Sequence, residues 1–210
     1  MEITSVGCIA TDLFVNDYNN VNLGGAAVPD LSALTSLADF KAQLAAVLAK
    51  LDQTGAEVLI ATGPDVTVLP QYAEKVAKLK AAGFSDADST GWLTAMRQRI
   101  RDYNAELLAQ VQSHPKVHVV DLYALVGDVY ANGADVGARH LWSKPMGGLL
   151  SLDAMHFSDT GYALLANAFI RALNDAEGTH VAEVDPAAVF ANDANSPDAL
   201  QAAGFACAGN

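Results

Sequence analysis

Two short apolar runs, separated by helical segments, constrain the fold of this chain most. Glu57–Thr62 predicts a buried strand that Gly63-Pro64 interrupts, and Val117–Leu122 predicts a second strand. Apolar residues recur at helical spacing ahead of and between these runs, which predicts helices over 37–51, 71–82 and 92–112. Strands that alternate with helices are typical of parallel βαβ units. We therefore expect an α/β fold, a three-layer α/β/α sandwich with a mostly parallel sheet.

The sequence after residue 122 predicts two further helices and a long C-terminal tail. After residue 175 the sequence is rich in Asp, Asn, Ala, Pro and Gly, which favours a segment that wraps the surface. We expect residues 1–175 to form a single domain and residues 176–210 to be an extension of that domain. The remaining expected elements are a short helix over 123–130, a Gly-rich loop over 131–150, a helix over 160–173, and ordered pieces at 181–184 and 187–190.

Composition and charge narrow the functional classes. The 210 residues carry a net charge of −12, which opposes binding to nucleic acid or to anionic lipid. No motif with metal-ligand spacing occurs, so no cofactor is expected. No apolar run is long enough to span a bilayer, and the first residues lack the pattern of a signal peptide. As written, the chain is expected to be soluble and cytoplasmic, although an exported origin stays open because a leader could be missing.

Asp153 lies three residues before His156, in a turn that precedes a long apolar helix beginning near Gly161-Tyr162. A carboxylate at that spacing can hold an imidazole in one tautomer and stabilise its cation, which is what a general base needs. The alternative interpretation is structural: Asp153 caps the helix and His156 only packs.

The pattern Asp-x-x-His-x-x-x-x-Gly-Tyr, followed by an Ala-rich helix, resembles the last sequence block of the SGNH/GDSL hydrolases. Weaker similarities extend the resemblance over residues 36–175: the helix after Ser36, the turn at Pro64-Asp65, the pair Tyr103-Asn104 and the strand ending in Val-Asp-Leu. The resemblance implies a flavodoxin-like fold that is truncated or rearranged at its N-terminus. It also implies that His156 is the base, that Asp153 orients it, and that a serine near the N-terminus is the nucleophile.

The N-terminal 35 residues depart from this family because no Gly-Asp-Ser occurs anywhere in the chain. We prefer the alignment that places residues 13–17 on the family's Asn-Asp block, which makes Asn16 the side chain expected to bind the oxyanion. Asn16 could equally be a turn residue in an Asn-rich loop. Two other alignments place Ala10-Thr11-Asp12 on the same block, or read residues 7–12 as a degraded Gly-Asp-Ser block. The serine turn is lost under each of them.

The missing block has catalytic and structural consequences. Ser5, Ser151 and Ser158 are candidate replacement nucleophiles if folding brings one of them to His156. Loss of the family's serine strand should also expose strand edges, which either Ile3–Ile9 or a second subunit would cover. A homodimer is therefore among the expected assemblies.

Three functions follow from these observations. The leading one is a hydrolase of small carboxylic esters that uses His156 and Asp153. In the second, Asp12, Asp17, Asp153 and His156 hold a divalent metal whose bound water attacks an ester or phosphoester. The third is a folded, non-catalytic remnant of an SGNH hydrolase.

Overall fold

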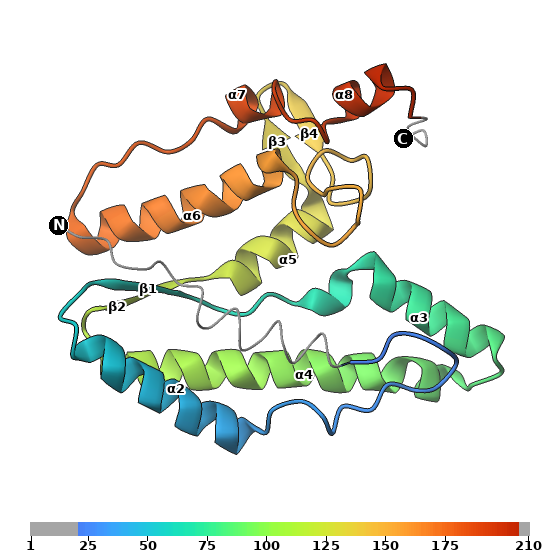
Figure 1. Ribbon diagram of the computed structural model, residues 1–210, viewed down its shortest axis with the longest axis horizontal. Helices are drawn as coiled ribbons and strands as arrows, with labels where there is room; N and C mark the ends of the chain where they lie inside the picture. Colours follow the sequence, from blue (N-terminus) through green and yellow to red (C-terminus); the bar gives the residue numbers. More distant parts are fainter. Residues whose placement is uncertain (1–20, 206–210) are drawn as a thin grey trace. The chain divides into compact units, whose positions relative to one another are not determined.

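Strands β1 (Val58–Ala61) and β2 (Val117–Val120) pair in parallel, with Val58 opposite Val117 and Ala61 opposite Val120. They belong to a computed structural model that describes residues 21–205 (Figure 1). The predicted strands and their parallel pairing are confirmed, and the chain is of mixed α/β class. Within residues 21–205 this sheet has two strands, and a second sheet, also of two strands, is antiparallel.

The chain divides into two units. The first contains residues 21–67 and 71–123, and the second contains residues 68–70 and 124–205. The C-terminal tail belongs to the second unit together with the helix that precedes it. Each unit has its own sheet.

Three helices accompany β1 and β2, namely α2 (Leu37–Asp52), α3 (Pro70–Ala81) and α4 (Asp86–Val111). A short 3-10 turn, η1 (Val66–Val68), follows β1. Helix α2 packs on α4 through stacked rings of Phe40 and Tyr103, whose centroids are 4.4 Å apart. Ser36 and Ser85 cap the two helices by accepting hydrogen bonds from backbone N–H groups in the first turn.

Polar side chains at the carboxyl ends of β1 and β2 stabilise the strand ends. Thr62 Oγ1 donates to Asp121 Oδ1 at 3.0 Å and accepts from the Tyr123 N–H. The buried Asn104 amide donates to Gly63 O and accepts from Gly63 N, both at 2.8 Å. This pairing gives Asn104 a structural role, because its amide replaces a neighbouring strand at an otherwise unpaired peptide group.

The second unit begins with α5 (Leu122–Asn132), whose first two residues belong to the first unit, and continues with the hairpin β3 (Ala134–Val136) and β4 (Arg139–Leu141). The hairpin lies within the segment expected to be an irregular loop, so that expectation was incomplete. Its turn is two residues long and begins with Gly137 at φ 59°, a conformation that suits tight hairpins. A hydrophobic core cluster of the second unit contains Val129, Val136, Leu141 and Leu149.

Helix α6 (Asp159–Glu177) ends at Gly178, which adopts a left-handed conformation with φ 60°. The chain then returns along the helix. Asn174 binds both the N–H and the carbonyl of Val181, and Asn167 does the same for Val184. Seven helical residues rise by about 10.5 Å and three extended residues by about 10 Å, so the two asparagines match two points of the returning segment.

Two short helices complete the described chain, α7 (Pro186–Phe190) and α8 (Pro197–Ala202). Between them, the buried Asp193 accepts hydrogen bonds from the backbone N–H and the hydroxyl of Thr160, at 2.9 and 2.7 Å. The tail is therefore tied to the start of α6. None of the helices in residues 21–205 is both long and apolar enough to cross a membrane.

Candidate active site

The Asp153–His156 pair lies in a loop that two backbone contacts close at its base. Leu150 and Phe157 form an antiparallel bridge, and the Ser151 N–H donates to His156 O at 2.9 Å. Ala154, at the tip, has a positive φ of 57°, which is uncommon for a residue with a Cβ. The loop therefore has a defined backbone conformation, and Ala154 carries local strain.

The Asp153 carboxylate organises this loop. Oδ1 accepts hydrogen bonds from the Ser151 hydroxyl at 2.6 Å and from the backbone N–H groups of Met155 and His156 at 2.9 Å each. Oδ2 binds His156 Nδ1 at 2.6 Å. These bonds, with the one to the His156 ring first in importance, hold the pKa of Asp153 well below its usual range.

His156 is oriented as a general base would need. Its Nδ1 is engaged by Asp153, whereas its Nε2 has no hydrogen-bond partner among the described residues. The side chain is 62% exposed, so Nε2 can reach a molecule that arrives from solvent. A carboxylate on Nδ1 favours the tautomer in which Nε2 carries the lone pair.

Asp153 does not cap helix α6, so the helix-cap interpretation is wrong. The cap of α6 is Ser158, whose hydroxyl accepts from the Gly161 N–H at 3.2 Å and donates to Gly148 O at 2.8 Å. Asp153 lies outside the helix and binds N–H groups of its own loop. Its structural role is therefore to hold the loop, which is compatible with a chemical role for the same carboxylate.

Of the candidate replacement nucleophiles, the two in the described part of the chain, Ser151 and Ser158, are not placed to attack a substrate. The Ser151 hydroxyl donates to Asp153, and the Ser158 hydroxyl is buried beneath the first turn of α6. Neither has a hydrogen bond to His156. Ser5 and Asn16 lie outside the described residues, as do Asp12, Asp17 and the segment Ile3–Ile9.

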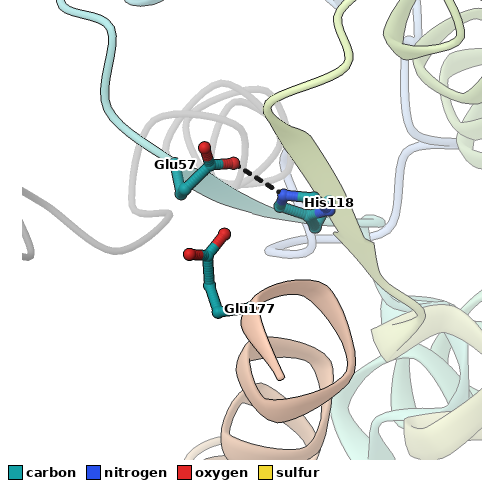
Figure 2. A group of neighbouring side chains, drawn as sticks. All are labelled: Glu57, His118 and Glu177. Carbon is teal, nitrogen blue, oxygen red and sulfur yellow. Dashed lines mark hydrogen bonds and ion pairs between the residues drawn. The ribbon is translucent and has the colours of Figure 1, made fainter. Parts of the chain in front are cut away.

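A carboxylate–histidine contact is by itself a common feature of this chain. His118 binds Glu57 at 2.9 Å (Figure 2), His114 binds Asp52 at 2.7 Å, and His140 binds Asp135 at 2.7 Å. Asp153 differs from these three partners because it accepts four hydrogen bonds and lies beside a backbone of positive φ. These two features, and not the pairing alone, distinguish the candidate site.

His140 serves as the internal comparison. It faces Asp135 across the β3–β4 hairpin, and its ring meets the Trp142 ring edge-on with centroids 4.5 Å apart. It also borders a cavity of about 370 Å³ between α5, the hairpin and α6. Its ring is also packed against Gly133, where an added Cβ would lie 2.7 Å from Nε2, so packing and the bond to Asp135 together hold this imidazole.

The donors around Asp153 and His156 do not complete a metal site in the described chain. Among residues 21–205, no third carboxylate, imidazole or thiolate lies near enough to both side chains to make a three-ligand set. The predicted partners Asp12 and Asp17 lie outside these residues, so the metal hypothesis stays a prediction.

Tyr130 is a neighbour of the site that the sequence did not indicate. Its ring meets the Phe157 ring edge-on, with centroids 6.4 Å apart. Tyr130 lies near the end of α5, far from Asp153 along the chain, and no local pattern singles it out.

Comparison with known proteins found no match among family models, curated proteins or solved structures.

Proposed function

We propose that this protein hydrolyses small carboxylic esters, with His156 as the general base and Asp153 as the residue that orients it. The observation that carries the proposal is the arrangement of the two imidazole nitrogens. Nδ1 is held by a carboxylate with a lowered pKa, whereas Nε2 has no partner in residues 21–205 and belongs to a side chain that is 62% exposed.

The reaction follows from that arrangement. Nε2 removes a proton from the nucleophile, whose oxygen bonds to the acyl carbon, and the imidazolium returns the proton to the alcohol as its bond to the acyl carbon breaks. A water nucleophile yields the free acid in this step. A serine nucleophile is left acylated, and a water deprotonated by Nε2 in the same way then releases the acid and restores the serine. The nucleophile is either water or a serine outside the described residues, because Ser151 and Ser158 are otherwise engaged. Asn16 is the proposed donor to the oxyanion. Activation of water is a weaker device than a positioned serine, so slow turnover of activated esters is expected.

The surroundings of the loop favour an apolar acyl group. Leu152 and Met155 flank Asp153 on either side and are both exposed. Their side chains provide apolar surface next to the imidazole, on which a short acyl chain can lose contact with water.

We also propose a fold and an assembly for this protein. The parallel pairing of β1 and β2 supports an SGNH-like three-layer sandwich as the fold. We also expect the protein to be soluble and to lack nucleic-acid partners. Where strand edges are uncovered, we expect it to pair as a homodimer.

The decisive experiment compares hydrolysis of p-nitrophenyl acetate and butyrate by the wild type, His156→Ala and His140→Ala. His140→Ala is the matched control because it removes another Asp-paired imidazole of the same unit. Exposed histidines react weakly with activated esters, and this control measures that background. We expect His156→Ala to lose at least tenfold in rate and His140→Ala to retain it. Equal rates for all three proteins would favour the non-catalytic remnant.

A chelator separates the proposed reaction from the metal-dependent alternative. Dialysis against EDTA should leave the rate unchanged if His156 acts on water or serine directly. A reversible loss that Zn²⁺ or Mn²⁺ restores would replace the proposal by metal-assisted hydrolysis.

A further inference from the structure

The cavity between α5, the β3–β4 hairpin and α6 is a second place in this chain where a small molecule fits. Its volume is about 370 Å³, and the residues that line it all belong to the second unit. Asp153 and His156 are not among them. Ligand pockets commonly measure about 300–1,000 Å³, so this cavity is near the lower end of that range and suits a compact ligand.

The inner wall of the cavity is apolar. Leu125 and Val129 line it from successive turns of α5, and Leu164 lines it from α6. Val129 belongs to the hydrophobic core cluster of the second unit, and Leu125 and Leu164 pack against that cluster. Because closely packed core residues have little freedom to move, this wall has a defined shape. It can cover an apolar face of a ligand.

Three polar side chains line the cavity, and each is held by a partner while it keeps hydrogen-bonding atoms free. The Asn132 amide donates to Asp128 Oδ1 at 2.6 Å, one turn away on α5. Arg171 on α6 donates through Nη1 to Glu183 Oε2 at 2.7 Å. Among residues 21–205, no partner binds Asp128 Oδ2, Asn132 Oδ1, or Nε and Nη2 of Arg171. The cavity therefore has free acceptors on its α5 side and free donors on its α6 side.

The hairpin forms the third side, and its shape is also defined before any ligand arrives. Asp135 and His140 bind each other at 2.7 Å. Gly133, which joins α5 to β3, has φ 70°, and an added Cβ would lie 2.3 Å from Leu141 O. Only glycine allows the backbone to come so close there. A preformed cavity loses less conformational entropy when it binds a ligand.

The charges that line the cavity oppose a charged ligand of either sign. The Asp128 carboxylate repels an anion, and the Arg171 guanidinium repels a cation. A neutral ligand whose polar groups both donate and accept can bind on both sides, and a hydroxyl is such a group. A compact ring that carries several hydroxyls and also has apolar C–H faces is a sugar.

We propose that this cavity binds a neutral monosaccharide unit. The sugar hydroxyls donate to Asp128 and Asn132 and accept from Arg171, and one face of the sugar ring lies on the apolar wall. The inference does not rest on the proposed ester hydrolysis, since neither Asp153 nor His156 takes part in it.

The test is a titration of the isotopically labelled protein with glucose, galactose, mannose and N-acetylglucosamine, followed by NMR. At least one of these sugars should saturate, with a Kd of about 1–10 mM, and should shift the Gly133 N–H and the Asn132 side-chain amide. Ethanolamine, glycine and acetate are the cationic, zwitterionic and anionic probes, and each should bind at least tenfold more weakly. The proposal is overturned if none of the sugars saturates or if a charged probe binds more tightly than all of them.

Two variants show whether the sugar occupies the cavity. Asp128→Asn and Arg171→Gln should each raise the Kd of the bound sugar at least fivefold. Both residues are exposed, so the melting temperature should change little. Asp175→Asn and Arg139→Gln are the matched controls, because they alter the same residue types outside the cavity and should leave the Kd unchanged. An unchanged Kd in both cavity variants would place the sugar elsewhere and overturn the proposal.

Discussion

The Ser151 hydroxyl and the His156 imidazole bind different oxygens of one carboxylate, each at 2.6 Å. Ser151 donates to Oδ1 of Asp153 and His156 binds Oδ2. In a serine hydrolase the nucleophile bonds to the imidazole nitrogen opposite the one that the carboxylate holds. Here the serine lies on the carboxylate side, so it supports Asp153 and is badly placed to attack.

The first prediction follows for Ser151→Ala. The variant should retain the hydrolysis rate within about fivefold, because the backbone N–H groups of Met155 and His156 still hold Asp153. The measurement is ester hydrolysis, combined with mapping of any serine labelled by a phosphonate. A rate loss of three orders of magnitude, or a label on Ser151, would identify it as the nucleophile after all.

The second prediction concerns Asp153→Asn. Asparagine can still accept the loop N–H groups through its amide oxygen, but it cannot offset an imidazolium charge or fix the required tautomer. The comparable change in serine hydrolases costs about four orders of magnitude, and here a smaller loss, at least tenfold, is expected. Thermal melting should change little. Asp135→Asn, which alters the partner of His140, is the control that should retain the rate.

The third prediction concerns Gly161 in the first turn of α6. A Cβ there would lie 2.4 Å from Leu149 O and 2.7 Å from Cδ1 of Phe157, so the helix and the loop could not keep their contact. Gly161→Ala should lower the free energy of unfolding by roughly 1–3 kcal/mol. Gly127→Ala in α5 meets no atom within 4 Å and should be neutral or stabilising by about 0.5–1 kcal/mol. Urea denaturation of both variants is the measurement, and equal effects would contradict the packing argument.

The fourth prediction concerns Asp193 and pH. Burial opposes ionisation of this carboxyl, but hydrogen bonds from Thr160 and Asn195 outweigh it and lower its pKa. A lowered folded-state pKa means that the stabilisation is complete above the ordinary value, near 4, and is lost as the pH falls through the folded value. Asp193→Ala should therefore cost roughly 2–3 kcal/mol at pH 7, and progressively less below pH 4.

Denaturant unfolding at several pH values measures that difference. Asp198→Asn is the control, since its ion pair with Arg139 is exposed and should contribute at most about 1 kcal/mol. A cost for Asp193→Ala that does not change with pH would show that the interaction does not depend on ionisation.

Where apolar periodicity dominates, the sequence was enough to predict individual helices and strands and the mixed α/β class. The helix predicted over 37–51 is observed over 37–52, and both predicted strands are present within one or two residues of their expected ends. Helix α4 begins at Asp86 instead of Trp92, because Ser85 and Asp88 form a cap that a Gly-, Ser- and Asp-rich segment concealed. The hairpin strands were missed because three residues are too few to show a period of two.

The candidate site also combines features that the sequence predicted with features that it did not. The Asp153–His156 contact is local, so the spacing of the two residues was enough to predict it. Tyr130 approaches through the packing of α5 on Phe157, a tertiary contact with no signature in either segment. The tail expected at 181–184 is extended, but what holds it is the amide pair on α6, which only the folded helix aligns.

The two anchoring asparagines of α6, Asn167 and Asn174, also determine where insertions and deletions in this chain can be tolerated. The span between Gly178 and His180 precedes the backbone anchor at Val181 and includes Thr179, whose hydroxyl donates to Asn174 Oδ1 at 2.8 Å. Added residues there would lengthen a loop and cost at most that side-chain bond, and both backbone anchors would stay in place. One residue inserted between Val181 and Val184 would move Val184 by about 3.4 Å, away from an asparagine that the helix holds still. Natural variants of this protein should therefore tolerate indels just after α6 and conserve the three-residue interval that follows.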